Sequence, residues 1–175
     1  LYAQRFNIYR EQSRQTGKTF DLTKVLGMDW GAGLRNAKML VVHFNQDEAG
    51  KNRRGMIDAA NMLPRFLKFH TIKTKKVKGK QMLVEEEDFS PSLKAREVKN
   101  EERNNFLKIF AVGTSETQAE RTGRGDSPRF VYVDEINFIR HTTAMLGGIL
   151  FAHGTARLLA IRSNQRHGIY FTSTP

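Results

Sequence analysis

Short apolar runs alternate with helix-like patterns along this chain, and this alternation constrains the fold more than any other feature. The runs expected to form strands are residues 6–9, 39–44, 106–113, 130–133 and 168–172. Apolar residues at helical spacing follow several of these runs. Strands that alternate with helices form a parallel sheet covered on both faces. The sequence therefore predicts an α/β fold with a mostly parallel sheet.

Two stretches carry the clearest helical patterns. One begins at Asp47 and is interrupted near Pro64, and the other covers residues 142–159. The region of about 70–105 does not fit the alternation, because the basic run KTKKVKGK is followed there by an acidic patch. We expect a hairpin or surface insertion in this region. Its last part, residues 94–105, is almost wholly polar and is expected to be an exposed loop or a short helix.

Length and composition limit the class of protein. A chain of 175 residues predicts a single domain, 1–175, and the absence of cysteine excludes disulfides and thiolate metal sites. We find no secretory signal and no apolar stretch near the roughly 20 residues that cross a bilayer. We therefore expect an intracellular protein without a membrane partner. The net charge of +11 favours nucleic acid as a partner, although a basic solvated surface fits it equally well.

The segment QSRQTGKT, residues 12–19, lies between the first predicted strand and a helical pattern, where a phosphate-binding loop belongs. Lys18 suits the β and γ phosphates, and the Thr19 hydroxyl suits magnesium. The residues expected to bind nucleotide are Gln15, Thr16, Gly17, Lys18 and Thr19. Gln12 replaces the usual first glycine, and a Gly-Lys-Thr tripeptide is also common as a simple helix cap.

Two adjacent carboxylates end the predicted strand 130–133, where α/β sheets place their ligands. Asp134 suits magnesium, and Glu135 suits the water that attacks the γ phosphate. A strand capped by solvated acids is the alternative, but the upstream loop argues against it. Together the motifs predict a P-loop ATPase of the additional-strand, catalytic-glutamate type, which uses ATP and Mg²⁺.

The combined motifs resemble tailed-bacteriophage terminase large subunits. The segments that carry this resemblance are SRQTGKT at 13–19, NMLPRFL at 61–67, TGRG at 122–125, FVYVDEINFI at 130–139 and TSTP at 172–175. The resemblance implies that Arg14 stabilises transition-state charge, with Arg121 and Arg124 as the other candidates. It also implies that Thr172, Ser173 and Thr174 couple hydrolysis to movement.

The function implied by this resemblance is ATP hydrolysis that drives double-stranded viral DNA into a capsid. A ring homo-oligomer, a portal protein and a small terminase subunit are the implied partners, in the host cytoplasm and transiently at the capsid portal. That family continues into a nuclease domain, so we expect this chain to be a fragment without nuclease activity. Two alternatives stay open: another P-loop nucleic-acid motor such as a helicase, and a non-enzymatic basic DNA-binding module.

Overall fold

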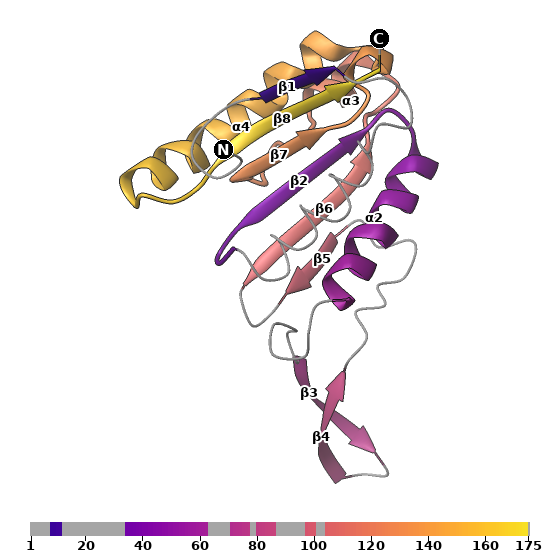
Figure 1. Cartoon of the computed structure of the whole chain (residues 1–175), viewed down its shortest axis with the longest axis vertical. Helices are drawn as coiled ribbons and strands as arrows, with labels where there is room; N and C mark the ends of the chain where they lie inside the picture. Colours follow the sequence, from indigo (N-terminus) through magenta and orange to yellow (C-terminus); the bar gives the residue numbers. More distant parts are fainter. Residues whose placement is uncertain are drawn as a thin grey trace.

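The computed structural model describes residues 8–11, 34–62, 71–77, 80–86, 97–100 and 104–174. Its main body is a six-stranded sheet (Figure 1). The strands of this sheet are β1 (Ile8–Glu11), β2 (Lys38–His43), β5 (Glu97–Asn100), β6 (Asn105–Ala111), β7 (Phe130–Val133) and β8 (Gly168–Ser173). Their spatial order is β1-β8-β7-β2-β6-β5, with all neighbours parallel except β5 and β6. The predicted mostly parallel sheet is confirmed.

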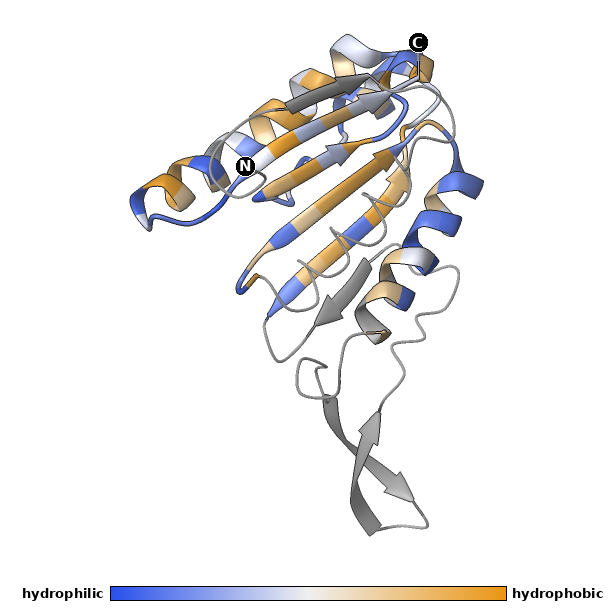
Figure 2. Ribbon diagram, viewed as in Figure 1, coloured by the Kyte–Doolittle hydropathy of each residue, from blue (hydrophilic) through white to orange (hydrophobic). Residues whose placement is uncertain are grey.

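Helices cover both faces of this sheet. The described helices are α2 (Gln46–Asn61), α3 (Glu116–Glu120), the 3₁₀ turn η3 (Ile136–Phe138) and α4 (Thr142–Arg162). Alternate residues of β2 point to opposite faces, so Val41 packs in the core cluster that includes Met56 of α2, and Val42 packs in the cluster that includes Met145 of α4. The central strands are accordingly largely apolar, whereas much of α2 is hydrophilic (Figure 2).

The polar region before β6 differs from the prediction of a loop or short helix. Residues Glu97–Asn100 form β5 and pair antiparallel with β6. The main-chain pairing with β6 gives this polar segment its strand structure. Asn105 is fully buried: its Oδ1 accepts from Ala37 N at 3.0 Å, and its Nδ2 donates to Leu34 O at 2.9 Å. This amide satisfies main-chain groups that the sheet leaves unpaired.

Most of the basic run lies in two paired strands. Strands β3 (Thr71–Val77) and β4 (Lys80–Glu86) pair antiparallel in a separate two-stranded sheet (Figure 1). Three lysines of the run, Lys73, Lys75 and Lys76, lie in β3, and Lys80 begins β4.

Helix α4 corrects the expectation that no apolar stretch approaches the length of a membrane span. Its 21 residues are, by length and composition, apolar enough to cross a bilayer, and a third of its most apolar window is buried inside the protein. The helix is this apolar because it has apolar residues both on its buried face and on its exposed face. Ile149 is fully buried against the sheet, whereas Leu150, Phe151 and Leu158 are 53%, 79% and 61% exposed.

Gly148 is the contact at which α4 packs on α3, and it gives a first prediction. A Cβ at this position would lie 2.2 Å from Glu120 O and 2.9 Å from Thr122 O. Because both atoms are backbone, Gly148→Ala is expected to lower the free energy of unfolding by about 1–3 kcal/mol in urea titrations. The adjacent Gly147→Ala is the control. It meets nothing within 4 Å and is expected to stabilise by about 0.5–1 kcal/mol; equal effects would contradict the packing argument.

His153 of α4 is a buried polar side chain. It is 3% exposed, and its Nδ1 lies 2.9 Å from Pro128 O. Burial lowers the pKa of His153, helped by nearby His167 and Arg157, against the opposing effect of the Pro128 carbonyl. The folded protein therefore favours the neutral ring.

This lowered pKa predicts acid sensitivity. The unfolded chain takes up a proton near the ordinary value of 6.5, whereas folded His153 resists it. Stability from this group is therefore full above pH 6.5 and is lost as pH falls toward the folded pKa. We expect His153→Asn, whose amide can still donate to Pro128 O, to lose less stability than the parent between pH 7.5 and 5.5. Urea midpoints at the two pH values measure this, and equal losses would contradict it.

Candidate nucleotide site

The carboxyl ends of β2, β7 and β8 bring the predicted acidic pair and the predicted coupling residues together. Asp134 N continues the sheet by donating to Val42 O at 2.9 Å. In the register of β7 and β8, Val133 lies opposite Phe171. Asp134 and Thr172 are thus the next residues on adjacent strands. Side chains at this side of a parallel sheet converge on one place.

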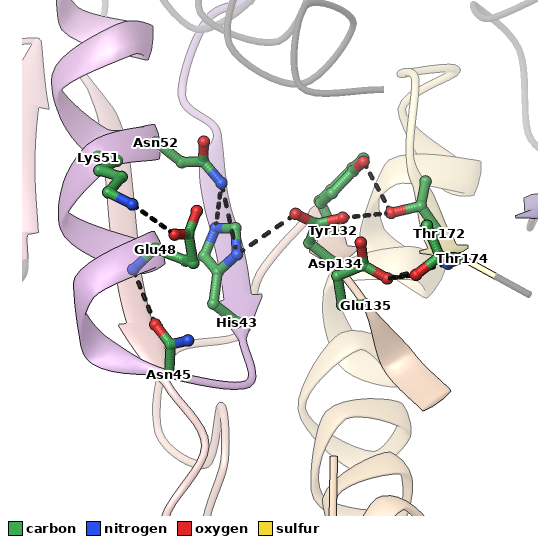
Figure 3. A network of polar contacts seen from close by, with 10 residues as sticks. All are labelled: His43, Asn45, Glu48, Lys51, Asn52, Tyr132, Asp134, Glu135, Thr172 and Thr174. Atoms are coloured by element: carbon green, nitrogen blue, oxygen red, sulfur yellow. Dashed lines mark hydrogen bonds and ion pairs between the residues drawn. The ribbon is translucent and has the colours of Figure 1, made fainter. Parts of the chain in front are cut away.

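Asp134 is held by the hydroxyl group of Thr172 on the neighbouring strand β8 (Figure 3). Thr172 Oγ1 donates to Asp134 Oδ1 at 2.7 Å. Tyr132 Oη lies 2.9 Å from Thr172 Oγ1, and it donates there because the threonine proton is already used. The Asp134 side chain is 12% exposed. The carboxylate is therefore fixed in direction and still open to a ligand.

The second oxygen of Asp134 faces His43, the last residue of β2. His43 Nδ1 lies 3.5 Å from Asp134 Oδ2, and Asn52 Nδ2 of helix α2 lies 3.2 Å from His43 Nε2. Burial lowers the pKa of His43 and outweighs the raising effect of Asp134. A neutral ring that accepts from Asn52 at Nε2 presents its Nδ1–H to Asp134. A chain of polar contacts thus runs from α2 to the acidic strand.

Glu135 adopts a strained backbone and is bound to the end of β8. Its φ of 54° and ψ of 48° lie in the left-handed region, which is costly for a residue with a Cβ. Glu135 Oε2 accepts from both N and Oγ1 of Thr174, each at 2.9 Å. Asn137 Nδ2 donates to Thr174 O at 3.3 Å, and Asn137 N donates to Ser173 Oγ at 3.4 Å. The segment after β7 and the end of β8 therefore form one hydrogen-bonded unit.

The two further arginine candidates lie on the turn that leads to β7. Both are exposed, and Arg124 forms an ion pair with Glu120. Both line a groove of about 700 Å³ at the carboxyl ends of β2 and β6. Phe44 also lines this groove, and its ring lies 5.9 Å from that of Phe138 in η3. The groove therefore adjoins the segment that follows Glu135.

The predicted phosphate loop falls outside the described residues. This applies to Arg14, Gln15, Thr16, Gly17, Lys18 and Thr19. The strand before the loop is described: β1 ends at Glu11, which is paired with Ser173. One strand, β8, therefore separates β1 from the acidic strand β7.

One described carboxylate, that of Asp134, could contribute a ligand to magnesium bound together with a nucleotide. Among residues 34–62 and 104–174, no group of three or more His, Asp or Glu side chains is arranged to hold a metal ion. Magnesium in nucleotide sites needs only one or two carboxylates, because phosphate and water oxygens complete its shell. Asp134 offers one oriented carboxylate of that kind.

Sequence reasoning missed three members of this network: His43, Asn52 and Tyr132. His43 ends a strand on the side where Asp134 lies, which was the available signal. Tyr132 lies inside an apolar strand, and Asn52 lies in a polar helix, so neither differs from its surroundings in the sequence.

The strand order and the acidic strand end define the class as an α/β fold with a strand inserted between β1 and the acidic strand. Two solved structures share this fold. The HK97 bacteriophage large terminase has a TM-score of 0.54 and 14% identity over 94% of this chain. The large terminase ATPase domain of Thermus phage P74-26 has a TM-score of 0.53 and 12% identity over 97%. The fold is that of phage large terminase ATPase domains.

These matches concern parts of longer proteins. The chain covers 28% of the HK97 protein and 59% of the P74-26 domain. No family model matches the sequence, and no curated protein sequence matches it.

Proposed function

We propose that this chain is the ATPase motor domain of a phage large terminase and hydrolyses ATP to move double-stranded DNA. One observation carries the proposal: Asp134 and Glu135 at the end of β7 are hydrogen-bonded to Thr172 and Thr174 of β8. This unit lies on the fold shared with two terminase structures, one strand away from β1. The predicted phosphate loop follows β1 in the sequence.

In the proposed reaction, Glu135 orients a water molecule and takes its proton as the water attacks the γ phosphorus. Asp134 and the Thr19 hydroxyl would hold magnesium, which when bound offsets the phosphate charge. Lys18 would contact the β and γ phosphates, and Arg14 would balance the charge that develops in the transition state. Residues Gln15, Thr16 and Gly17 would supply main-chain N–H groups to the phosphates.

The contacts of Thr174 support a coupling role for the end of β8. A carboxylate accepts hydrogen bonds more strongly than a carboxylic acid does. When Glu135 takes a proton, its bonds from Thr174 N and Oγ1 therefore weaken. Asn137, which is bonded to Thr174 O, moves with the same segment. A proton transfer at one side chain thus changes the packing between β7 and β8.

The proposal extends to the setting of the motor. Residues 1–175 form the motor domain, in which nuclease activity is not expected. The domain works in a ring of identical copies with a portal protein and a small terminase subunit, in the host cytoplasm and at the capsid portal. Both named relatives are phage large terminases, which supports this setting.

The test is magnesium-dependent phosphate release from ATP by the purified chain, with and without double-stranded DNA. Hydrolysis stimulated by duplex DNA without strand separation supports the motor, whereas unwinding of the duplex points to a helicase. The proposal fails if the chain neither hydrolyses ATP nor gains thermal stability from ATP with magnesium. That result favours the DNA-binding module.

Thr174→Val tests the coupling contact. Valine keeps the main-chain bond to Glu135 Oε2 but removes the 2.9 Å hydroxyl bond. Loss of one hydrogen bond to a charged group costs about 1.5–3 kcal/mol, so kcat is expected to fall on the order of tenfold or more. Thr174→Ser keeps the hydroxyl and is the control. Steady-state ATPase assays compare them, and equal rates for Val and Ser would remove the hydroxyl from the mechanism.

A further inference from the structure

A group of cations lies at the amino ends of the central strands, whereas Asp134 and Glu135 lie at the carboxyl ends. Helix α4 runs back across the sheet and ends near the first residues of β8 (Figure 1). We call the cations and histidines at this place the strand-start patch; its members are Arg129, His153, Arg157, Arg166 and His167. Arg129 is fixed in the sheet, since its N donates to Lys38 O at 2.9 Å and its O accepts from Gly168 N at 3.2 Å.

Charged residues differ between the two ends of the parallel strands. The segments that surround the strand starts are residues 34–38, 104–106, 127–130 and 153–168, and none of these described residues is acidic. They contain two further cations, Arg35 just before β2 and Lys38 at its first position, and a third, Arg162, at the end of α4. The site acids Asp134 and Glu135 lie at the opposite, carboxyl ends of the strands. Within residues 34–62 and 104–174, these segments therefore carry positive charge without any acidic residue among them.

Two buried polar atoms in the patch have no hydrogen-bond partner. They are Arg129 Nε and His153 Nε2, on side chains that belong to residues only 8% and 3% exposed. The other ends of both groups are anchored, because Arg129 Nη1 donates to Gln165 Oε1 and His153 Nδ1 donates to Pro128 O. Only Arg129 Nε is a spare donor, because a neutral His153 that donates from Nδ1 has an acceptor at Nε2.

Two cations of the patch, Arg129 and Arg166, repel each other. Burial lowers the pKa of Arg129, and the charge of Arg166 lowers it further. His153 and His167 have ring centroids 6.2 Å apart, and His167 and Arg157 both disfavour a proton on His153. Like charges held together lower each other's pKa unless an anion lies between them. Such an arrangement favours an anionic partner.

We propose that the strand-start patch binds the phosphate backbone of double-stranded DNA. The choice of DNA rests on the proposed function, and the multiple cations support it. The patch and its flanking cations extend from β2 across β7 and β8 to α4, a width that one small anion does not span. Duplex DNA carries one charge per about 1.7 Å of its axis and can face several of these cations at once.

The test compares two double variants that lose the same charge. Arg157→Gln with Arg166→Gln removes two cations of the patch, whereas Arg54→Gln with Arg140→Gln removes two exposed cations elsewhere. Binding of a labelled DNA duplex is followed by fluorescence anisotropy without ATP, over a range of salt concentrations. We expect the patch variant to bind about tenfold or more weakly and to lose about two units of the slope of log K against log salt. The control variant should lose little.

Equal weakening in the two variants would overturn the proposal, because it would reflect net charge alone. Unchanged DNA binding with weaker binding of poly-glutamate would also overturn it, in favour of an acidic protein partner. Should the double variant fail to fold, the exposed Arg157→Gln alone is expected to lose about one unit of slope. ATP hydrolysis without DNA is measured on the same variants. Hydrolysis at the parental rate with lost DNA binding separates this proposal from the ATPase proposal.

Discussion

Glu135→Gln is expected to reduce ATP hydrolysis by about 10²–10⁴-fold while ATP still binds. Glutamine keeps an oxygen that can accept from Thr174 N and Oγ1, the two contacts that position the native carboxylate. Its amide cannot take a proton from the attacking water. The loss should therefore appear in kcat and leave the affinity for ATP nearly unchanged.

Two measurements on Glu135→Gln separate chemistry from folding. Phosphate release gives kcat, and the thermal shift produced by ATP with magnesium reports binding. A variant with near-parental kcat would remove Glu135 from the role of base. A variant that loses both hydrolysis and the ATP-induced shift would instead assign Glu135 to nucleotide binding, and the water-activating role would then pass to another residue.

Asp134→Asn has the second largest expected effect, with a different signature. The amide oxygen can still accept from Thr172 Oγ1, but the charge that attracts magnesium is gone. A metal contributes several kcal/mol to such a transition state, so hydrolysis is expected to fall on the order of 10²–10³-fold. Unlike Glu135→Gln, this variant should need more magnesium for the same ATP-induced thermal shift.

Thr172→Val is the comparison for Asp134→Asn. It removes the 2.7 Å bond that orients Asp134 but leaves the carboxylate charge. We expect a smaller loss of hydrolysis with an unchanged magnesium requirement. If Asp134→Asn shows the parental magnesium dependence, Asp134 is a structural anion for Thr172 and His43 rather than a metal-side acid.

The strands were predictable because burial on both faces leaves runs of apolar residues without alternation. The predicted strand 130–133 coincides with β7. The position of the acidic pair was predictable as well, because the two residues directly follow this strand. Strand β5 was not predictable, because its sequence EVKN has no apolar run. Its strand structure comes from the pairing with β6. Helix α3 has only five residues, and its cap, in which Gln118 N donates to Ser115 Oγ, is a local contact with little sequence signal.

The contacts within the site could not be predicted, because they depend on the register in which β7 and β8 pair. That Thr174 reaches Glu135, and that Thr172 reaches Asp134, follows from the pairing of β7 with β8, which the sequence does not state. His43 was missed because a histidine at the end of an apolar strand is usually a satisfied core residue. The phosphate loop stays a prediction, since the structure describes β1 before it but not the loop itself.

The position of β8 has a consequence for how the protein is made. This strand is formed by residues Gly168–Ser173, yet it lies between β7 and β1, and it pairs Ile8 with Tyr170. A growing chain on the ribosome therefore holds β1 without its partner until nearly all of these residues have emerged. Contacts so distant in sequence form slowly, and an unpaired strand is exposed to aggregation meanwhile. Chaperone dependence during synthesis should accordingly fall once residue 173 has left the exit tunnel.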